Sequence, residues 1–110
     1  MATIDKDRKL MTLVNVFTVE PANQRQLVQL LARATETIRH APGFISASLH
    51  RSLDGTKVTM YAQWRSVADY QAMRENPTAP PYLQQALAIA KFYPGMYEVA
   101  EMFSGTALEH

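Results

Sequence analysis

The chain of 110 residues contains no cysteine, only four glycines and a single tryptophan, Trp64. Without cysteine it can form no disulfide, no thiolate nucleophile and no cysteine-ligated metal centre. Four widely spaced glycines cannot build a dinucleotide-binding fingerprint or a phosphate-binding P-loop. A G-x-S-x-G nucleophile elbow is missing as well. Several nucleotide-dependent and covalent mechanisms are thereby excluded.

Long hydrophobic runs and blocks of one charge are also missing. No apolar stretch approaches the roughly 18 residues that a membrane-spanning helix needs. The N-terminal sequence MATIDKDRKL lacks the apolar core of a signal peptide. Eleven Lys and Arg stand against ten Asp and Glu, and the basic residues are scattered. We therefore expect a cytoplasmic protein with neither a membrane nor a nucleic-acid partner.

The histidines do not predict a metal site. His40, His50 and His110 are far apart in the sequence, whereas a structural metal needs three or four converging ligands. The C-terminal Leu-Glu-His resembles the start of a purification tag. We expect a flexible N-terminal segment over residues 1–9, one domain over 10–105 and a tail over 106–110.

The first part of the chain predicts a strand and a helix. Residues 11–19 alternate as a strand does, with Leu13, Asn15 and Phe17 on one face and Thr12, Val14, Val16 and Thr18 on the other. From Pro21 to His40, apolar residues recur every three or four positions, which is the spacing of one helix face. HAPG at 40–43 ends this helix, because proline cannot continue it.

Residues 44–52 and 57–64 predict two strands joined by Asp54-Gly55, a pair that favours a two-residue hairpin turn. Such a turn sets the register of the two strands. On the Trp64 face it pairs Leu49 with Met60, Ala47 with Ala62 and Ile45 with Trp64. His50 then lies opposite Thr59 on the other face.

The last part predicts two helical pieces and a strand. Ser66 and Asp69 resemble a capping box that opens a helix through Tyr70, which Asn76-Pro77 ends. TAPP opens a second piece with Leu83, Ala86, Leu87 and Ala90 on one side, and residues 94–103 are typical of a strand. This order predicts an α+β fold, a ferredoxin-like βαββαβ arrangement with a four-stranded antiparallel sheet and its helices on one face.

The opposite face of that sheet would expose Val14, Val16 and Tyr61. An apolar face of this kind on a small domain favours an interface. We therefore expect a homodimer in which two sheets pack face to face as a dimeric α+β barrel.

An apolar cavity with a few polar groups is expected between the sheet and the helices, and this is the usual form of a small-molecule site. Asn15, Met60, Trp64 and Tyr70 can point into it. Around them we expect Leu13, Phe17, Ile45, Leu49, Met73 and Leu83. Such a lining suits a flat aromatic ligand. For Trp64 and Tyr70, simple core packing is the alternative.

PGFISASLHRSLDGTKVTMYAQWRSVADY, residues 42–70, resembles the antibiotic biosynthesis monooxygenase family. The resemblance is greatest to members that oxidise polyketide anthrones and naphthols to quinones, and it extends over about residues 10–105. PGF, H-x-S-x-DGT and YAQW-x-S carry it most specifically. It implies a dimeric barrel, a small aromatic substrate and direct reaction of the deprotonated phenol with O₂, without metal, flavin or haem.

The resemblance also suggests roles for single residues. Trp64 matches a pocket tryptophan whose indole N–H bonds a substrate oxygen, and Tyr70 matches a pocket tyrosine. With Asn15 they are the candidate catalytic residues. His50 matches a histidine of the family, although the register turns it to the opposite face. The quinone-forming enzymes carry Asn where this chain has Met60, and Arg where it has Gln84, a further candidate substrate contact.

Two other functions remain open. Met60 and Gln84 favour a binding or structural member of the same fold that has no turnover. The haem-degrading enzymes of the superfamily resemble this chain at Asn15 and Trp64. Those enzymes use an axial histidine on the second helix, and residues 66–92 contain no histidine.

Overall fold

The computed structural model describes residues 10–76 and 82–106. The expected flexible segment 1–9, the TAPP motif at 78–81 and most of the expected tail lie outside these ranges. The elements are β1 (Met11–Val19), the 3-10 helix η2 (Pro21–Asn23), α1 (Gln24–Ile38), β2 (Phe44–Arg51), β3 (Lys57–Trp64), α2 (Val67–Arg74), α3 (Tyr82–Ile89), β4 (Ala90–Tyr93) and β5 (Met96–Tyr97). None of the helices in the described ranges is long and apolar enough to span a bilayer.

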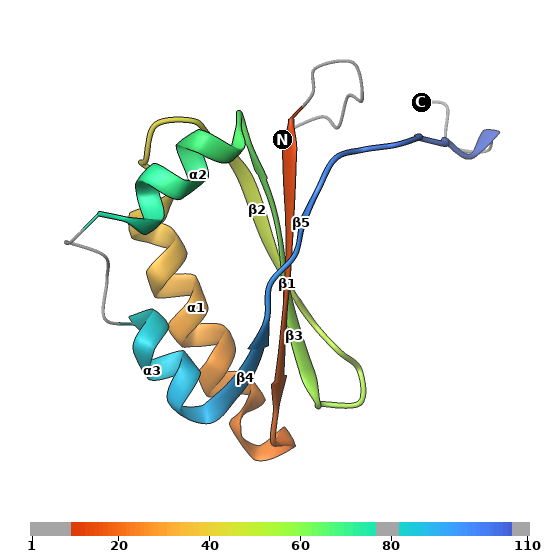
Figure 1. Cartoon of the computed structure of the whole chain (residues 1–110). Coiled ribbons are helices and arrows are strands. Elements are labelled where there is room, and N and C mark those ends of the chain that lie inside the picture. The colour runs from red at the N-terminus through yellow and green to blue at the C-terminus, as the bar shows by residue number, and fades with distance from the viewer. Residues whose placement is uncertain (1–9, 77–81, 107–110) are drawn as a thin grey trace.

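One antiparallel sheet forms the centre of the fold. Its strands lie in the order β2-β3-β1-β4, and β5 also pairs with β1. The helices α1, α2 and α3 all lie on one side of the sheet (Figure 1). The predicted α+β ferredoxin-like arrangement is confirmed, with a five-stranded sheet in place of the expected four strands.

The last strand begins and ends earlier than the predicted range 94–103. Phe92 in β4 pairs with Phe17 of β1, and the two rings stack with their centroids 4.8 Å apart. Pro94 has no N–H to continue the ladder, so it separates β4 from β5. The Gly95 carbonyl still accepts the Val14 N–H at 2.9 Å, which keeps the register across the break. Beyond Tyr97 the chain leaves the sheet (Figure 1).

The predicted register of the β2–β3 hairpin is confirmed over most of its length. Leu49 lies opposite Met60, and Ala47 lies opposite Ala62. The pairing of Ile45 with Trp64 is wrong, because the register shifts between Phe44 and Ser46 and brings Phe44 opposite Trp64. Such a β-bulge inserts one extra residue and turns its side chain away from the face that simple alternation predicts.

The hairpin loop is wider than the predicted two-residue turn. The N–H of Ser52 donates to the carbonyl of Lys57 at 3.0 Å, and the N–H of Gly55 donates to the carbonyl of Ser52 at 3.2 Å. A β-turn therefore has Leu53 and Asp54 at its centre, and Gly55 follows it with a φ of 82°. The Asp54 carboxylate stabilises this loop by accepting hydrogen bonds from the Ser52 hydroxyl and from the N–H and hydroxyl of Thr56.

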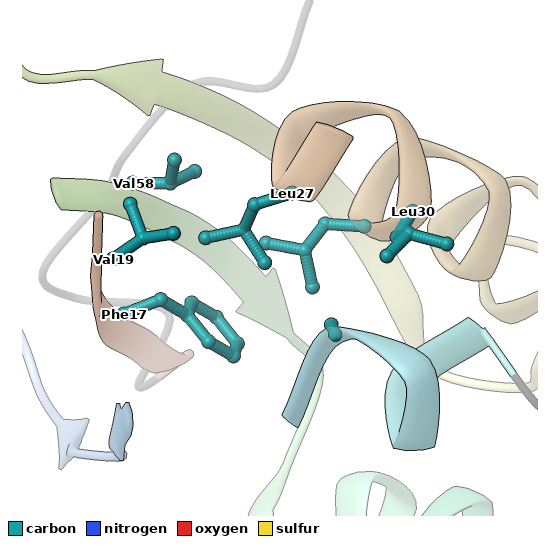
Figure 2. Close-up of a cluster of buried hydrophobic side chains, with 7 residues drawn as sticks. Phe17, Val19, Leu27, Leu30 and Val58 are labelled. Carbon is teal, nitrogen blue, oxygen red and sulfur yellow. The ribbon is translucent and has the colours of Figure 1, made fainter. Parts of the chain in front are cut away.

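Two clusters of buried side chains fill the space between the sheet and the helices. The first, beneath α1 and α3, contains Phe17, Val19, Leu27, Leu30, Leu31, Val58 and Ala86 (Figure 2). The second, beneath α2, contains Met11, Leu13, Ala62, Trp64 and Tyr70. Fully burying one large apolar side chain stabilises a fold by about 1.5–3 kcal/mol. Asn15 lies on β1 between Leu13 and Phe17 and belongs to neither cluster.

A polar network fixes the start of α2. The Ser66 hydroxyl accepts the Asp69 N–H at 3.1 Å, as expected of an N-cap, and donates to the Asp69 carboxylate at 2.9 Å. The Arg65 guanidinium donates to both carboxylate oxygens of Asp69 at 2.8 Å. Hydrogen bonds from Arg65 first, and then from Ser66, hold the pKa of Asp69 below its usual value. The Gly43 carbonyl accepts the Arg65 N–H at 2.7 Å, which joins the PGF turn to this network.

Replacing Gly43 by Ala should destabilise the fold more than replacing Gly55 by Ala. Both glycines have positive φ, 87° and 82°, and an alanine there costs about 1–2 kcal/mol. A Cβ at Gly43 would also lie 2.4 Å from Asp69 Cγ, whereas at Gly55 the nearest atom is 3.3 Å away. We expect Gly43→Ala to cost about 1–3 kcal/mol more than Gly55→Ala. Urea unfolding of both variants measures the difference, and equal losses would contradict it.

Asp54 should make stability depend on acid pH. The hydrogen bonds from Thr56 and then Ser52 lower the pKa of Asp54 from 3.8 to about 2. Because this pKa is lower in the folded than in the unfolded state, the stabilisation is present above pH 3.8 and is lost as the pH falls towards 2. In denaturant unfolding between pH 6 and 2, the free-energy difference between the wild type and Asp54→Asn should shrink below about pH 4. A difference that stays constant would exclude this role of Asp54.

Candidate active site

A cavity of about 110 Å³ lies where the two core clusters meet. A cavity needs about 10–15 Å³ to hold one water, so this space is large enough for more than one. Eight of the predicted residues line it: Leu13, Asn15, Phe17, Met60, Trp64, Tyr70, Met73 and Leu83. The structure therefore brings the three candidate catalytic residues together around one mostly apolar space.

Three predicted substrate contacts do not line this cavity. The β-bulge places Phe44 in the lining in place of Ile45, and Ile45 and Leu49 border a separate groove between β2 and α1. Gln84 is exposed on α3. The turn of that helix directs Leu83 and Ala86 towards the core and leaves Gln84 in solvent.

Asn15 supplies an unused polar group in the lining. It lies opposite Met60 in the sheet and is 7% exposed. Its Oδ1 atom is buried and has no hydrogen-bond partner. A buried polar atom without a partner costs about 1–3 kcal/mol. Because the side chain borders the cavity, a ligand with a hydroxyl group could satisfy this oxygen.

Trp64 both packs and lines the cavity. The side chain is 1% exposed at the end of β3. Its ring meets the rings of Phe44 and Tyr70 edge to face, with centroids 5.3 and 5.6 Å away. These contacts fix the orientation of the indole before any ligand enters. The two alternatives that the sequence left open for Trp64 are therefore compatible.

Sequence reasoning missed Arg74, which belongs to the lining. Its Nη1 atom donates a hydrogen bond to the Tyr70 hydroxyl at 3.0 Å. The spacing of four residues on one helix would have indicated this contact, since residues i and i+4 are neighbours on a helix surface. Other missed lining residues come from the packed face of α1: Leu31, Ala34, Thr35 and Ile38.

His50 lies away from the cavity, as the predicted register indicated. It is exposed on β2, where its Nε2 lies 2.8 Å from the Ser48 hydroxyl, and it is not a lining residue. Among residues 10–76 and 82–106, no three His, Asp or Glu side chains lie close enough together to hold a metal ion.

The comparisons with known proteins agree with this geometry. Residues 10–82 match the family described as antibiotic biosynthesis monooxygenase. Tetracenomycin-F1 monooxygenase of Streptomyces glaucescens is 46% identical over 110 residues, which cover 99% of this chain and 98% of the relative.

Two solved structures extend the comparison. A monooxygenase from the gene ActVA-Orf6 of Streptomyces coelicolor, solved with the ligand nanaomycin D, is 34% identical with a TM-score of 0.68 and matches 89% of this chain and 96% of its own. SnoaB, a cofactor-independent oxygenase from Streptomyces nogalater, has a TM-score of 0.78 at 22% identity over 88% of this chain and 99% of its own, a likeness of fold alone. The family match and the close relative together show that the chain belongs to the antibiotic biosynthesis monooxygenase family.

Proposed function

We propose that the protein is a monooxygenase that uses O₂ to convert a phenolic ring of a polyketide-like aromatic compound into a quinone. The observation that carries this proposal is the unpartnered Oδ1 of Asn15 in an apolar cavity beside Trp64 and Tyr70. Two relatives support the reaction class, since both the Streptomyces glaucescens and the Streptomyces coelicolor proteins are named monooxygenases. Nanaomycin D in the second structure supports an aromatic polyketide as the substrate class.

The proposed reaction requires an electron-rich ring held in a dry space. Loss of the phenol proton to water leaves an anion whose ring carbon can bond to O₂ and form a peroxide. That carbon then loses its hydrogen as a proton while the O–O bond breaks. One oxygen atom becomes the quinone carbonyl, and the other leaves as water. The apolar lining excludes solvent from the peroxide and so prevents side reactions.

The three candidate catalytic side chains have separate parts in this scheme. The Oδ1 of Asn15 accepts a hydrogen bond from a second substrate hydroxyl, one that keeps its proton, and so orients the ring. The fixed ring of Trp64 forms a flat wall, and its N–H can donate to a substrate oxygen. The hydroxyl of Tyr70 can donate to the oxygen that becomes negative. Preorganised donors of this kind stabilise charge that develops during a reaction.

Asn15→Leu should separate this function from a purely structural role. Leu removes the unpartnered oxygen, so the free energy of unfolding should rise by about 1–3 kcal/mol. Oxygen uptake with an anthrone such as 1,8-dihydroxyanthrone should fall by about tenfold or more, because one substrate hydrogen bond is lost. Thr12→Val is the matched control: Thr12 Oγ1 is also buried without a partner, but Thr12 is not a lining residue.

The control variant should become more stable and keep its activity. An oxygen electrode and the absorbance of the quinone product measure turnover, in buffer treated with a chelator. If Asn15→Leu destabilises the fold and leaves oxygen uptake unchanged, Asn15 is structural. If the wild type consumes no O₂ with any phenol or anthrone, the non-catalytic alternative is correct. The absence of a metal, flavin or haem requirement and the cytoplasmic location remain predictions from the sequence.

We also propose that the protein is a homodimer joined through the sheet face opposite the helices. Tyr93 and Tyr97 lie on this face and are 54% and 57% exposed. Val14 and Val16 of the central strand are only half-buried. Phe103, in the segment that leaves the sheet, is 90% exposed. An exposed apolar surface of this kind favours packing against a second copy.

Val16→Lys should break this dimer, because the new charge would be buried in the middle of the interface. Light scattering at micromolar concentration should give twice 12.4 kDa for the wild type and 12.4 kDa for the variant. Leu53→Lys is the control, since Leu53 is fully exposed at the tip of the hairpin and should leave the mass unchanged. Circular dichroism checks that both variants fold. A monomeric wild type would exclude the dimer.

A further inference from the structure

Arg74 is the one charged side chain in the lining of the candidate active site within the described part of the chain. It is exposed, so it reaches both the solvent and the cavity. Among residues 10–76 and 82–106 it forms no ion pair. A guanidinium that no carboxylate of these residues neutralises, at the edge of an apolar space, attracts an anion.

The contact between Arg74 and Tyr70 directs this charge inwards. Arg74 Nη1 donates to the Tyr70 hydroxyl at 3.0 Å, and Tyr70 is only 5% exposed. Because the hydroxyl oxygen accepts this bond, its own hydrogen remains free to be donated. A donor that is itself polarised by a neighbouring donor is a stronger one. The hydroxyl of Tyr70 can thus pass the effect of the Arg74 charge to an oxygen atom of the ligand.

We propose that Arg74, acting through the Tyr70 hydroxyl, makes this cavity select ligands in their ionised form, a phenolate or an enolate. The inference rests on the proposed function and names its substrate class more closely. An anion in an apolar cavity is unstable unless a charge or strong donors compensate it. No Lys or His lies among the described lining residues, so Arg74 supplies the one positive charge there, beside the neutral donors of Tyr70 and Trp64. Arg74 is in this view a positioning residue, and Tyr70 touches the ligand.

A pair of ligands that differ only in charge tests the proposal. 2-Hydroxy-1,4-naphthoquinone is an anion at neutral pH, and its methyl ether is neutral. Quenching of the fluorescence of Trp64, the single tryptophan, reports the binding of both. In Arg74→Gln we expect the Kd of the anion to rise about tenfold or more, and the Kd of the ether to change by less than about twofold. Arg74→Lys keeps the charge but loses the planar guanidinium. Its Kd for the anion should lie between that of the wild type and that of Arg74→Gln.

Arg33→Gln is a matched control. The guanidinium of Arg33 lies 5.8 Å from the ring centroid of Tyr82, the same distance that separates Arg74 from the ring of Tyr70. Arg33 is not a lining residue, so Arg33→Gln should change neither Kd. In a Tyr70→Phe background, Arg74→Gln should lose most of its effect on the anion, because the connecting hydroxyl is gone.

An equal rise in the Kd of both ligands in Arg74→Gln would assign Arg74 to packing and overturn the proposal. An unchanged Kd for the anion would overturn it as well. An Arg74→Gln effect that persists in full in the Tyr70→Phe background would overturn the route through Tyr70. If the wild type binds neither ligand and consumes no O₂, the proposed function itself fails. If the wild type turns over phenols and Arg74→Gln does so equally well, only the role of Arg74 is overturned.

Discussion

The alternation of side chains along β1 is the constraint on which the rest of the structure depends. This strand is central, because it pairs with β3 on one side and with β4 and β5 on the other. A shift of one residue would move its whole buried face to the solvent side. In the observed register Leu13, Asn15 and Phe17 all face the helices. The two core clusters form around the outer members of this set, and the amide stands at the place where the clusters meet.

Stability and function make opposite demands at that place. An apolar side chain at position 15 would fill the space between the clusters and remove an unpartnered oxygen, so the fold alone would favour it. The chain instead keeps an amide there, beside a cavity whose other walls are almost entirely apolar. A local loss of stability of this kind is typical of binding sites in small cores, because an acceptor without a protein partner is available to a ligand.

The network at the start of α2 connects the backbone at Gly43 to the helix that carries Tyr70 and Arg74. Gly43 allows the close approach of Asp69, and Arg65 and Ser66 hold the Asp69 carboxylate in place. These contacts set the position from which α2 begins. Tyr70 and Arg74 follow within two turns of that helix, so the geometry at the cavity depends on Gly43 and Asp69, neither of which is a lining residue.

Much of the fold could be predicted from local patterns. The period of β1, the apolar face of α1 and the pairing of Leu49 with Met60 depend on side chains that are close in sequence, and the structure confirms them. Asn15 could be named because an amide on an apolar strand face is unusual, and Trp64 and Tyr70 because they match pocket residues of the family that residues 42–70 resemble. The family follows from the motifs between residues 42 and 70 and from the comparisons.

Only the tertiary structure decided which other side chains reach the cavity. A bulge that no periodicity announces brought Phe44 to the position expected for Ile45. The packing of α3 left Gln84 in solvent, and the position of α2 brought Arg74 to the cavity. Each of these outcomes depends on contacts between segments that are distant in the sequence, whereas periodicity describes one segment at a time. The amino-acid sequence by itself therefore determined the strands, the helices and the position of Asn15 on the buried face of β1. The packing of the helices on the sheet determined that the charged side chain of Arg74 reaches the candidate site.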